Sequence, residues 1–268
     1  MVPDRQSVRV LPAGVANQIA AGEVVERPAS VVKELMENSL DAGASRLSLE
    51  IEGGGSTLIR LTDDGWGIPP DELVLAIQSH ATSKLTSITD LDEIATLGFR
   101  GEALPSITSI ARYSITSRTK DESQGWMLHG EGTANPSTPV PQAARPGTRF
   151  EVRDLFFNTP ARRRFLRTEK TESQHIEDVV RRIALSRFDV AIQFSRNTKL
   201  VWSLPRALDA DTRTQRVAKI CGRVFCDQAL TIDFEAAGLR LWGWLGLPAC
   251  ARRHADTQYF FVNGRSIK

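Results

Sequence analysis

The hydrophobic positions near the start of the chain predict a helix followed by a pair of strands. Apolar residues recur three and four positions apart in residues 30–42, which is the period of an amphipathic helix. Pro28 suits the start of this helix, and Gly43 suits its end. Residues 46–52 then alternate between apolar and polar, as strands do, and a glycine-rich turn leads into a second strand at 58–62.

Beyond this hairpin the pattern predicts further strands and helices of an α/β fold, interrupted by two irregular stretches. Residues 79–104 are rich in Ser, Thr and Gly and predict a mobile loop, and the proline-rich residues 134–146 predict a surface excursion. The other expected elements are a short helix at 71–78, strands at 107–117, 125–132 and 148–155, a helix at 173–186, and strands at 190–194 and 200–204.

A polar, turn-forming segment at 205–212 predicts a linker between two domains. The first domain then covers residues 1–204 and the second covers 213–268. Within the second we expect a short helix around 213–220 and strands near 230–234, 239–245 and 259–262. These elements are few, so we expect the second domain to be partial.

The composition is that of an ordinary globular protein, with 41% hydrophobic and 25% charged residues among 268. No apolar run approaches the roughly 18 residues of a spanning helix, and Asp4, Arg5 and Arg9 fit no export signal. We therefore expect a cytoplasmic protein without a membrane partner. The net charge of +2, from 34 basic and 32 acidic residues, indicates that any nucleic-acid surface must be a local basic patch.

The three cysteines are few and odd in number, which does not favour a disulfide framework. A zinc site could be drawn from Cys221, Cys226, Cys250 and His254, but their spacing fits none of the usual zinc patterns. Buried or reduced thiols are the favoured interpretation.

Two segments carry acids or amides in arrangements that suit ligand chemistry. Glu34, Asn38 and Asp41 are spaced so that they lie on one face of the first helix, although a solvated polar face has the same spacing. At the end of the strand at 58–62, Asp63 is followed by two spaced glycines at 65 and 67. A carboxylate so placed can fix the edge of a base while the glycines let backbone approach a ligand; an acidic β-turn is the alternative.

A third segment, 97–104, has two glycines just before a predicted helix start. Backbone amides at such a point can hold phosphate oxygens, although the glycines could simply permit a loop. Neither G-x-x-x-x-G-K-[ST] nor G-x-G-x-x-G occurs in the chain, so a nucleotide site here must use another architecture.

Taken together and in this order, the three segments resemble the GHKL ATPase superfamily, which includes DNA gyrase, the ninety-kilodalton heat-shock chaperone, histidine kinases and MutL. The resemblance is closest to the MutL family. It rests on ANQIAAGEVVERP at 16–28, KELMENSLDAG at 33–43, HATSK at 80–84, GFRGEAL at 98–104, FNTPARR at 157–163 and VNGR at 262–265. It implies a sandwich of helices on a mixed, mostly antiparallel sheet, followed by part of a second α/β domain of the ribosomal-S5-like type.

The same resemblance implies a role for each site residue. Glu34 polarises the attacking water, Asn38 binds Mg²⁺ through its amide oxygen, and Asp63 accepts a hydrogen bond from the adenine amino group. The remaining ATP contacts fall on Gly65, Gly67 and Thr148 around the base, on Thr82 and Lys84 in a lid, and on Gly98, Phe99, Arg100, Gly101, Glu102, Ala103 and Leu104 at the phosphates.

Two features depart from the family pattern. Asp64 stands where the family usually has Asn, and we expect its added negative charge to face away from the nucleotide. In the family a lysine of the second domain, beyond the Val-Asn-Gly-Arg stretch, contacts the terminal phosphate. No residue up to Lys268 is assigned to that role.

The implied function is ATP-dependent DNA mismatch repair. ATP would order the segment at 79–104 and join two units into a homodimer that couples mismatch recognition, by a protein of the MutS type, to later repair steps. Arg162, Arg163 and Arg164 would contact DNA phosphates without regard to sequence, although a solvated basic corner is the alternative. The location would be cytoplasmic, at the nucleoid in a bacterium.

Two rival functions remain open from the sequence. One is a scaffold that binds ATP and partner proteins without hydrolysis. The other is a histidine kinase or chaperone of the same superfamily, although no phosphoacceptor module occurs and the amino-terminal run at 16–28 fits neither.

Overall fold

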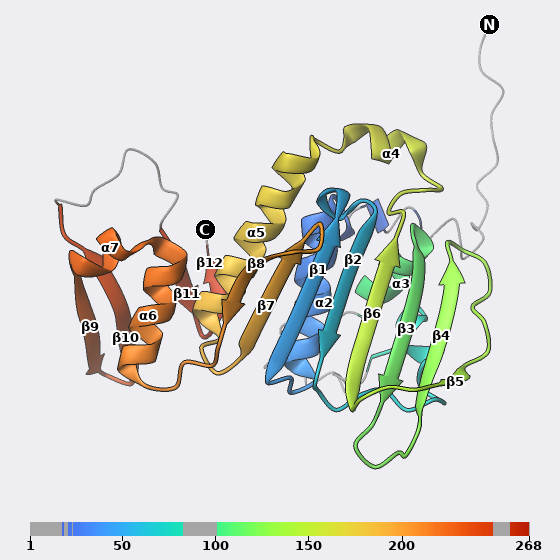
Figure 1. The fold of residues 1–268 in the computed structure, drawn as a ribbon, viewed down its shortest axis with the longest axis horizontal. Helices are drawn as coiled ribbons and strands as arrows, with labels where there is room; N and C mark the ends of the chain where they lie inside the picture. The colour runs from blue at the N-terminus through green and yellow to red at the C-terminus, as the bar shows by residue number, and fades with distance from the viewer. Residues whose placement is uncertain (1–17, 19–20, 23, 83–100, 249–257, 268) are drawn as a thin grey trace, which may run out of the picture.

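The computed structural model describes residues 18, 21–22, 24–82, 101–248 and 258–267, and its largest element is an eight-stranded sheet. The strand order is β5-β4-β3-β6-β2-β1-β7-β8, and only the β1–β7 pair is parallel. Helices lie against one face of the sheet, while the other face is open toward the viewer in Figure 1. The mixed, mostly antiparallel sheet with helices on it is the expected fold.

The strands of this sheet alternate buried and accessible residues, because one face packs against helices and the other meets water. In the central pair, Leu49 lies opposite Leu61 and Ile51 opposite Ile59. The bounds are β1 Arg46–Glu52, β2 Leu58–Asp63, β3 Arg112–Arg118, β4 Gly125–Glu131, β5 Val140–Gln142, β6 Gly147–Arg153, β7 Ala191–Arg196 and β8 Lys199–Leu204.

Two long helices supply most of the covering layer. Helix α2, Pro28–Asp41, begins with a proline in its first turn, and Gly43 just beyond it has a φ of 70° that ends the helical path. Helix α5, Glu169–Ser186, is capped by Thr168, whose hydroxyl oxygen accepts a bond from the Thr171 amide at 3.3 Å. Both helices bury an apolar stripe in the main core.

Two sequence predictions in this region were wrong or incomplete. The helix expected at 71–78 is a set of turns with one 3-10 turn, η2, at Leu75–Ile77. The strand expected from 107 is instead helix α3, Ala103–Ser109, and β3 begins only at Arg112. Apolar residues at 107, 110 and 111 fit a helical period as well as a strand, so a short run of this kind is ambiguous.

Other elements had no sequence prediction. Helix α4, Pro160–Phe165, buries no residue, and β5 lies within the proline-rich excursion. Strand β12, Arg265–Ile267, pairs with β11, Phe260–Val262. By contrast, the glycine-rich turn between the first two strands was predicted, and it is the 3-10 turn η1, Gly53–Gly55. Among the described helices, none combines the length and apolar composition that crossing a bilayer requires.

The second region contains α6, Ala210–Cys221, and α7, Arg223–Asp227, beside the β9–β10 hairpin, Ala229–Ala236 and Leu239–Gly246. Asp209 caps α6 through a reciprocal pair of bonds with Thr212. The last residues of the segment predicted as a linker, 205–212, are therefore helical. The position of the domain boundary stays a prediction.

Arg216 fixes the junction between the two regions. This α6 side chain is 4% exposed and donates to the carbonyl oxygens of Ala184, Arg187, Val190 and Pro205. Two of these carbonyls belong to the end of α5, where a cation offsets the negative end of the helix dipole. Without the guanidinium, these buried carbonyls would lose their donor.

Replacing Arg216 by Met should lower the free energy of unfolding by about 2–4 kcal/mol, because buried carbonyls lose charge-assisted bonds without replacement. Urea titration followed by tryptophan fluorescence measures this quantity. Arg240→Met is the matched control, because Arg240 pairs with Asp233 on an exposed surface and its loss should change stability little. An equal decrease in the free energy of unfolding in the two variants would contradict the structural role given to Arg216.

Candidate functional site

A half-buried carboxylate, that of Asp63, lies where β2, β6 and α2 meet. Asp63 ends β2, and the antiparallel β2–β6 pairing brings Thr148 to the same end of the sheet. Asp63 Oδ1 accepts bonds from the amides of Gly65 at 2.9 Å and Thr148 at 3.1 Å. Its Oδ2 accepts a bond from the Ser39 hydroxyl at 2.7 Å. Helix α2, strand β6 and the loop directly after Asp63 therefore hold this carboxylate in one orientation.

Burial raises the pKa of Asp63, and the three hydrogen bonds to the carboxylate lower it by less. An ionised carboxylate offers about four acceptor positions, and the protein donors occupy three of them. One acceptor position is thus left for a donor from outside these contacts. A ligand with an N–H group at this point would complete the set.

The glycines after Asp63 allow the backbone to approach its neighbours closely. Gly67 has a φ of 78°, and a Cβ there would lie 2.2 Å from the Arg118 carbonyl oxygen. A Cβ on Gly65 would lie 2.7 Å from the Ala42 carbonyl oxygen at the end of α2. Any larger residue at either position would displace backbone, so the loop needs glycine at both.

A second polar residue extends this network. The buried Ser117 hydroxyl on β3 accepts a bond from the Ile68 amide at 2.7 Å and donates to the Gly147 carbonyl oxygen at 3.0 Å. It also lies 3.0 Å from the Thr148 hydroxyl. The loop after Asp63 is therefore tied to β3 and β6 as well as to α2.

Ser39 and Ser117 were not among the predicted site residues, although each leaves a trace in the sequence. Ser39 stands four residues after Leu35, on the stripe that the helical period assigns to the core. Ser117 continues the buried alternation of Tyr113 and Ile115. A polar residue at a position that the period assigns to the interior indicates a hydrogen-bonding role.

Helix α2 carries the other predicted residues. Glu34 and Asn38 are one turn apart on the same face, and the Ser39–Asp63 bond fixes this helix beside the end of β2. Lys33 Nζ lies 3.2 Å from Glu34 Oε1 and 2.9 Å from Glu37 Oε2. Glu34 is about 7.5 Å along the helix axis from Ser39, which separates it from the Asp63 end of the site.

Asp64 turns away from this cluster, as expected. Its carboxylate accepts bonds from the Ser45 amide at 2.7 Å, the Ser45 hydroxyl at 2.8 Å and the Arg46 amide at 2.8 Å. Burial opposes ionisation of Asp64, but these bonds more than offset it and lower the pKa. Neutral donors at the start of β1 thus stabilise the additional negative charge. Its repulsion still contributes to the raised pKa of Asp63.

The predicted loop at 79–104, which includes the predicted phosphate contacts, is described only at residues 79–82 and 101–104. A Cβ on Gly101 would lie 2.6 Å from the Ala81 carbonyl oxygen, so the two ends of this segment are in contact beside Thr82. Glu102 precedes α3, and Ala103 and Leu104 form its first turn. The remaining predicted contacts, Lys84, Gly98, Phe99 and Arg100, lie outside the described residues.

Neither the basic triplet nor the cysteines join the Asp63 cluster. Arg162, Arg163 and Arg164 lie on α4. Burial raises the pKa of Cys221 to about 11 and also raises that of Cys226, so both thiols are protonated at neutral pH. Cys250 and His254, the other residues of the zinc alternative, lie outside the described residues. Within the described residues, no group of three or more His, Cys, Asp or Glu is placed to hold a metal.

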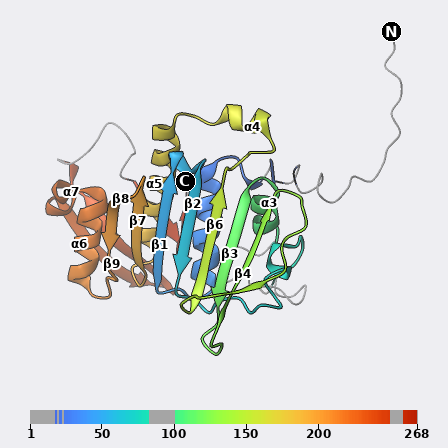
Figure 2. The same ribbon diagram turned by 45° about the vertical axis from the view of Figure 1, so that its right-hand side comes forward.

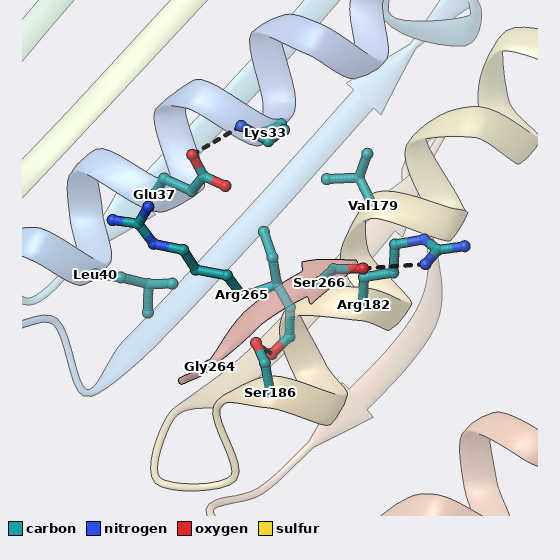
Figure 3. A pocket seen from close by; sticks show the side chains of 10 residues that line it. Lys33, Glu37, Leu40, Val179, Arg182, Ser186, Gly264, Arg265 and Ser266 are labelled. Carbon is teal, nitrogen blue, oxygen red and sulfur yellow. Dashed lines mark hydrogen bonds and ion pairs between the residues drawn. The ribbon is translucent and has the colours of Figure 1, made fainter. Parts of the chain in front are cut away.

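A cavity of about 260 Å³ lies on another side of α2, between that helix, α5 and the β11–β12 hairpin. Figure 3 shows the Arg265 side chain extending from the hairpin toward α2, and Arg182 donating to the Ser266 hydroxyl at 3.1 Å. No predicted site residue lines this cavity. It belongs to the junction between the two regions.

Two family models match the chain. Residues 26–141 match the model described as "Histidine kinase-, DNA gyrase B-, and HSP90-like ATPase". Residues 217–268 match the model described as "DNA mismatch repair protein, C-terminal domain". The first match contains the whole of α2 and the Asp63 loop, and the second contains most of the second region.

Curated relatives match over nearly the whole chain. The DNA mismatch repair protein MutL of Azotobacter vinelandii is 56% identical over 261 residues, which are 97% of this chain and 41% of the relative. That of Pseudomonas entomophila is 55% identical with the same coverage. The chain therefore spans about two fifths of the length of these relatives.

Solved structures share the fold. An Aquifex aeolicus MutL ATPase domain complexed with ADP is 29% identical, with a TM-score of 0.68 over 91% of this chain and 84% of that one. The N-terminal domain of a DNA repair protein is 23% identical, with a TM-score of 0.78 over 94% of this chain and 78% of that one. At this identity it supports the fold alone. By sequence and by fold, the chain belongs to the MutL family of DNA mismatch-repair proteins, in which it corresponds to the amino-terminal ATPase region.

Proposed function

We propose that this chain binds ATP with Mg²⁺ beside α2 and hydrolyses it slowly as part of DNA mismatch repair. The observation that carries the proposal is the Asp63 carboxylate, which is held by Ser39, Gly65 and Thr148 and keeps one acceptor position open. An adenine amino group is a donor of the required kind. The Aquifex MutL domain of similar fold was solved with ADP, which supports a nucleotide as the ligand.

The residues around Asp63 fit a purine. Gly65 and Gly67 present backbone without side chains, and Thr148 donates its amide to the carboxylate while its hydroxyl lies beside that of Ser117. Hydrogen bonds to the base edge would select adenine, because guanine carries a carbonyl oxygen where adenine carries its amino group. That oxygen would face the Asp63 carboxylate without a proton between them.

The donor set also fits Mg²⁺ bound chiefly by phosphates. The described residues contain no acidic cluster that could hold the ion alone, and Asn38 supplies one neutral amide oxygen, a hard ligand. When bound, the ion would neutralise charge on the phosphates during transfer. Asn38 would position it, while Thr82, Lys84 and the amides of residues 98–104 would hold the phosphates.

Glu34 is the proposed general base. Its carboxylate lies on the same face of α2 as Asn38, one turn away, so water bound near the terminal phosphate can be oriented and polarised by it. The ammonium of Lys33 at 3.2 Å holds this side chain by charge. In this arrangement α2 supplies both the metal ligand and the base.

The proposed biological role follows the family. Binding of ATP would join two units into a homodimer. The homodimer would receive a signal from a mismatch-recognition protein of the MutS type, and its Arg162, Arg163 and Arg164 would contact DNA phosphates. The proposed location is the cytoplasm, at the nucleoid in a bacterium.

Asp63→Asn should weaken ATP binding by about 30-fold or more, because the substituted amide has no acceptor left for the adenine amino group. The amide oxygen can still accept from Gly65 and Thr148, and the amide nitrogen can donate to Ser39, so the fold should persist. Calorimetric titration with a non-hydrolysable ATP analogue measures the affinity. Asp64→Asn is the matched control and should leave affinity within about twofold, since Asp64 faces Ser45 and Arg46.

The pH dependence of ATP binding by the unsubstituted chain gives a second readout. Burial raises the pKa of Asp63, so this carboxyl takes up a proton at a pH above the ordinary value of 3.8. Affinity should therefore be full at neutral pH and fall as the pH drops through the raised pKa. A nucleotide affinity that is equal in the Asp63→Asn variant and the unsubstituted chain would remove Asp63 from the site.

Glu34→Gln should reduce phosphate release by about 10²–10⁴-fold while leaving ATP affinity nearly unchanged, because the amide keeps the shape but cannot accept a proton. Glu37→Gln is the control, because Glu37 also forms an ion pair with Lys33. This variant removes an ion pair of Lys33 while leaving the proposed base in place. Similar rates for Glu34→Gln and the unsubstituted chain would remove Glu34 from catalysis. If the unsubstituted chain binds ATP but releases no phosphate, the scaffold alternative is favoured.

Adding the non-hydrolysable analogue should roughly double the mass of the 29.6 kDa chain in light scattering at high protein concentration. Asp63→Asn should remain at the monomer mass at an analogue concentration that saturates only the unsubstituted chain, because its affinity for the analogue is lower. A mass that stays constant in the unsubstituted chain would count against the nucleotide-linked dimer, even where calorimetry shows binding.

A further inference from the structure

The short helix α4 presents an exposed aromatic side chain next to arginines. Phe165, its last residue, is 83% exposed, the largest fraction for any large hydrophobic side chain in the described part of the chain. Arg163 and Arg164 directly precede it and are also exposed. No residue of α4 is buried, so packing within the chain does not account for an aromatic residue here.

The charge around Phe165 is positive. Residues 160–170 contain four arginines and one lysine against a single acid, Glu169, whose carboxylate accepts a bond from the Asn197 side chain at 2.8 Å. Within the described residues, the side chains of Arg163, Arg164 and Arg167 form no ion pair. These cations are therefore available to an anionic partner.

The segments on both sides of α4 hold it in place. Its side chains are exposed except that of Arg162, which is half-buried and lies beside Gly22. Before the helix, the Asn158 side-chain amide donates to the Ser109 carbonyl oxygen at 2.9 Å, and the Phe156 backbone amide donates to the Ile110 carbonyl oxygen at 2.7 Å. After it, Leu166 packs on the main core. In both Figure 1 and Figure 2, α4 lies beyond the end of the sheet between β6 and α5.

We propose that Phe165 is a base-stacking residue for single-stranded DNA, with Arg163, Arg164 and Arg167 contacting the phosphates on either side of the stacked base. An aromatic ring stacks on any base that is free of its neighbours, and arginine binds phosphates without regard to sequence. In a duplex the bases are already stacked, so the ring could reach one only by unstacking a step. The inference rests on the DNA partner of the proposed function. It adds that the bound DNA is single-stranded and that Phe165 distinguishes it from a duplex.

The test compares an oligothymidylate with a duplex of equal length, both labelled with fluorescein, by anisotropy at low salt without nucleotide. Phe165→Ala and Phe165→Leu should each weaken oligothymidylate binding by about fivefold or more, and Phe165→Trp should retain it, because only an aromatic face stacks. Duplex binding should change by less than about twofold in all three variants. Phe234→Ala is the matched control, because Phe234 on β9 is also exposed, at 63%, and should not affect either substrate.

Three results would overturn the proposal. Phe165→Ala could bind oligothymidylate as tightly as the unsubstituted chain, it could lose affinity for both substrates in equal proportion, or Phe165→Leu could keep full affinity. Sedimentation of the same samples tests whether Phe165 instead contacts a second copy of the chain. A change of mass in Phe165→Ala would assign the ring to such a contact. Failure of the unsubstituted chain to bind either DNA would remove the DNA partner as well, while ATP binding is decided independently by the Asp63 variant.

Discussion

The half-buried carboxylate of Asp63 is the constraint on which the arrangement of the site depends. A charged group that is partly removed from water needs hydrogen-bond donors, and Asp63 takes them from α2, from its own loop and from β6. These bonds hold the helix, the glycine loop and two strands in fixed relation. Burial still raises the pKa of the carboxyl, so the protein donors do not fully compensate its charge. One more donor from a ligand would complete the compensation, which is how a structural constraint becomes a binding site.

Helix α2 faces three surroundings at once. Its apolar stripe packs in the main core, Ser39 binds Asp63, and Lys33 and Glu37 line the cavity shared with α5 and the β11–β12 hairpin. Lys33 contacts both Glu37 in that cavity and the proposed base Glu34. The junction itself is stiffened by Arg216, whose guanidinium binds carbonyls on both sides of it. The helix with the proposed catalytic residues is thus also a wall of the junction.

The spacing of apolar residues predicted the helices and strands that bury one face and expose the other. Strand β1 has the expected bounds because its alternation is regular, and α2 follows its apolar stripe. The pattern failed at α3, where a short apolar run fits two periods, and at α4, which has no buried side at all. Periodicity also could not pair Asp63 with Thr148, 85 positions away, or with Ser39, because such contacts depend on strand order. The family resemblance supplied Thr148. Ser39 and Ser117 stand at positions that the period assigns to the interior, but their partners became visible only in the folded geometry.

A crystal structure of the chain with a non-hydrolysable ATP analogue and Mg²⁺ tests the central claim most directly. The account predicts the purine amino group about 2.7–3.2 Å from the Asp63 carboxylate and the Asn38 amide oxygen about 2.1 Å from the metal ion. A purine bound elsewhere, or an Asp63 carboxylate in contact only with Ser39, Gly65 and Thr148 while the nucleotide is present, would contradict it.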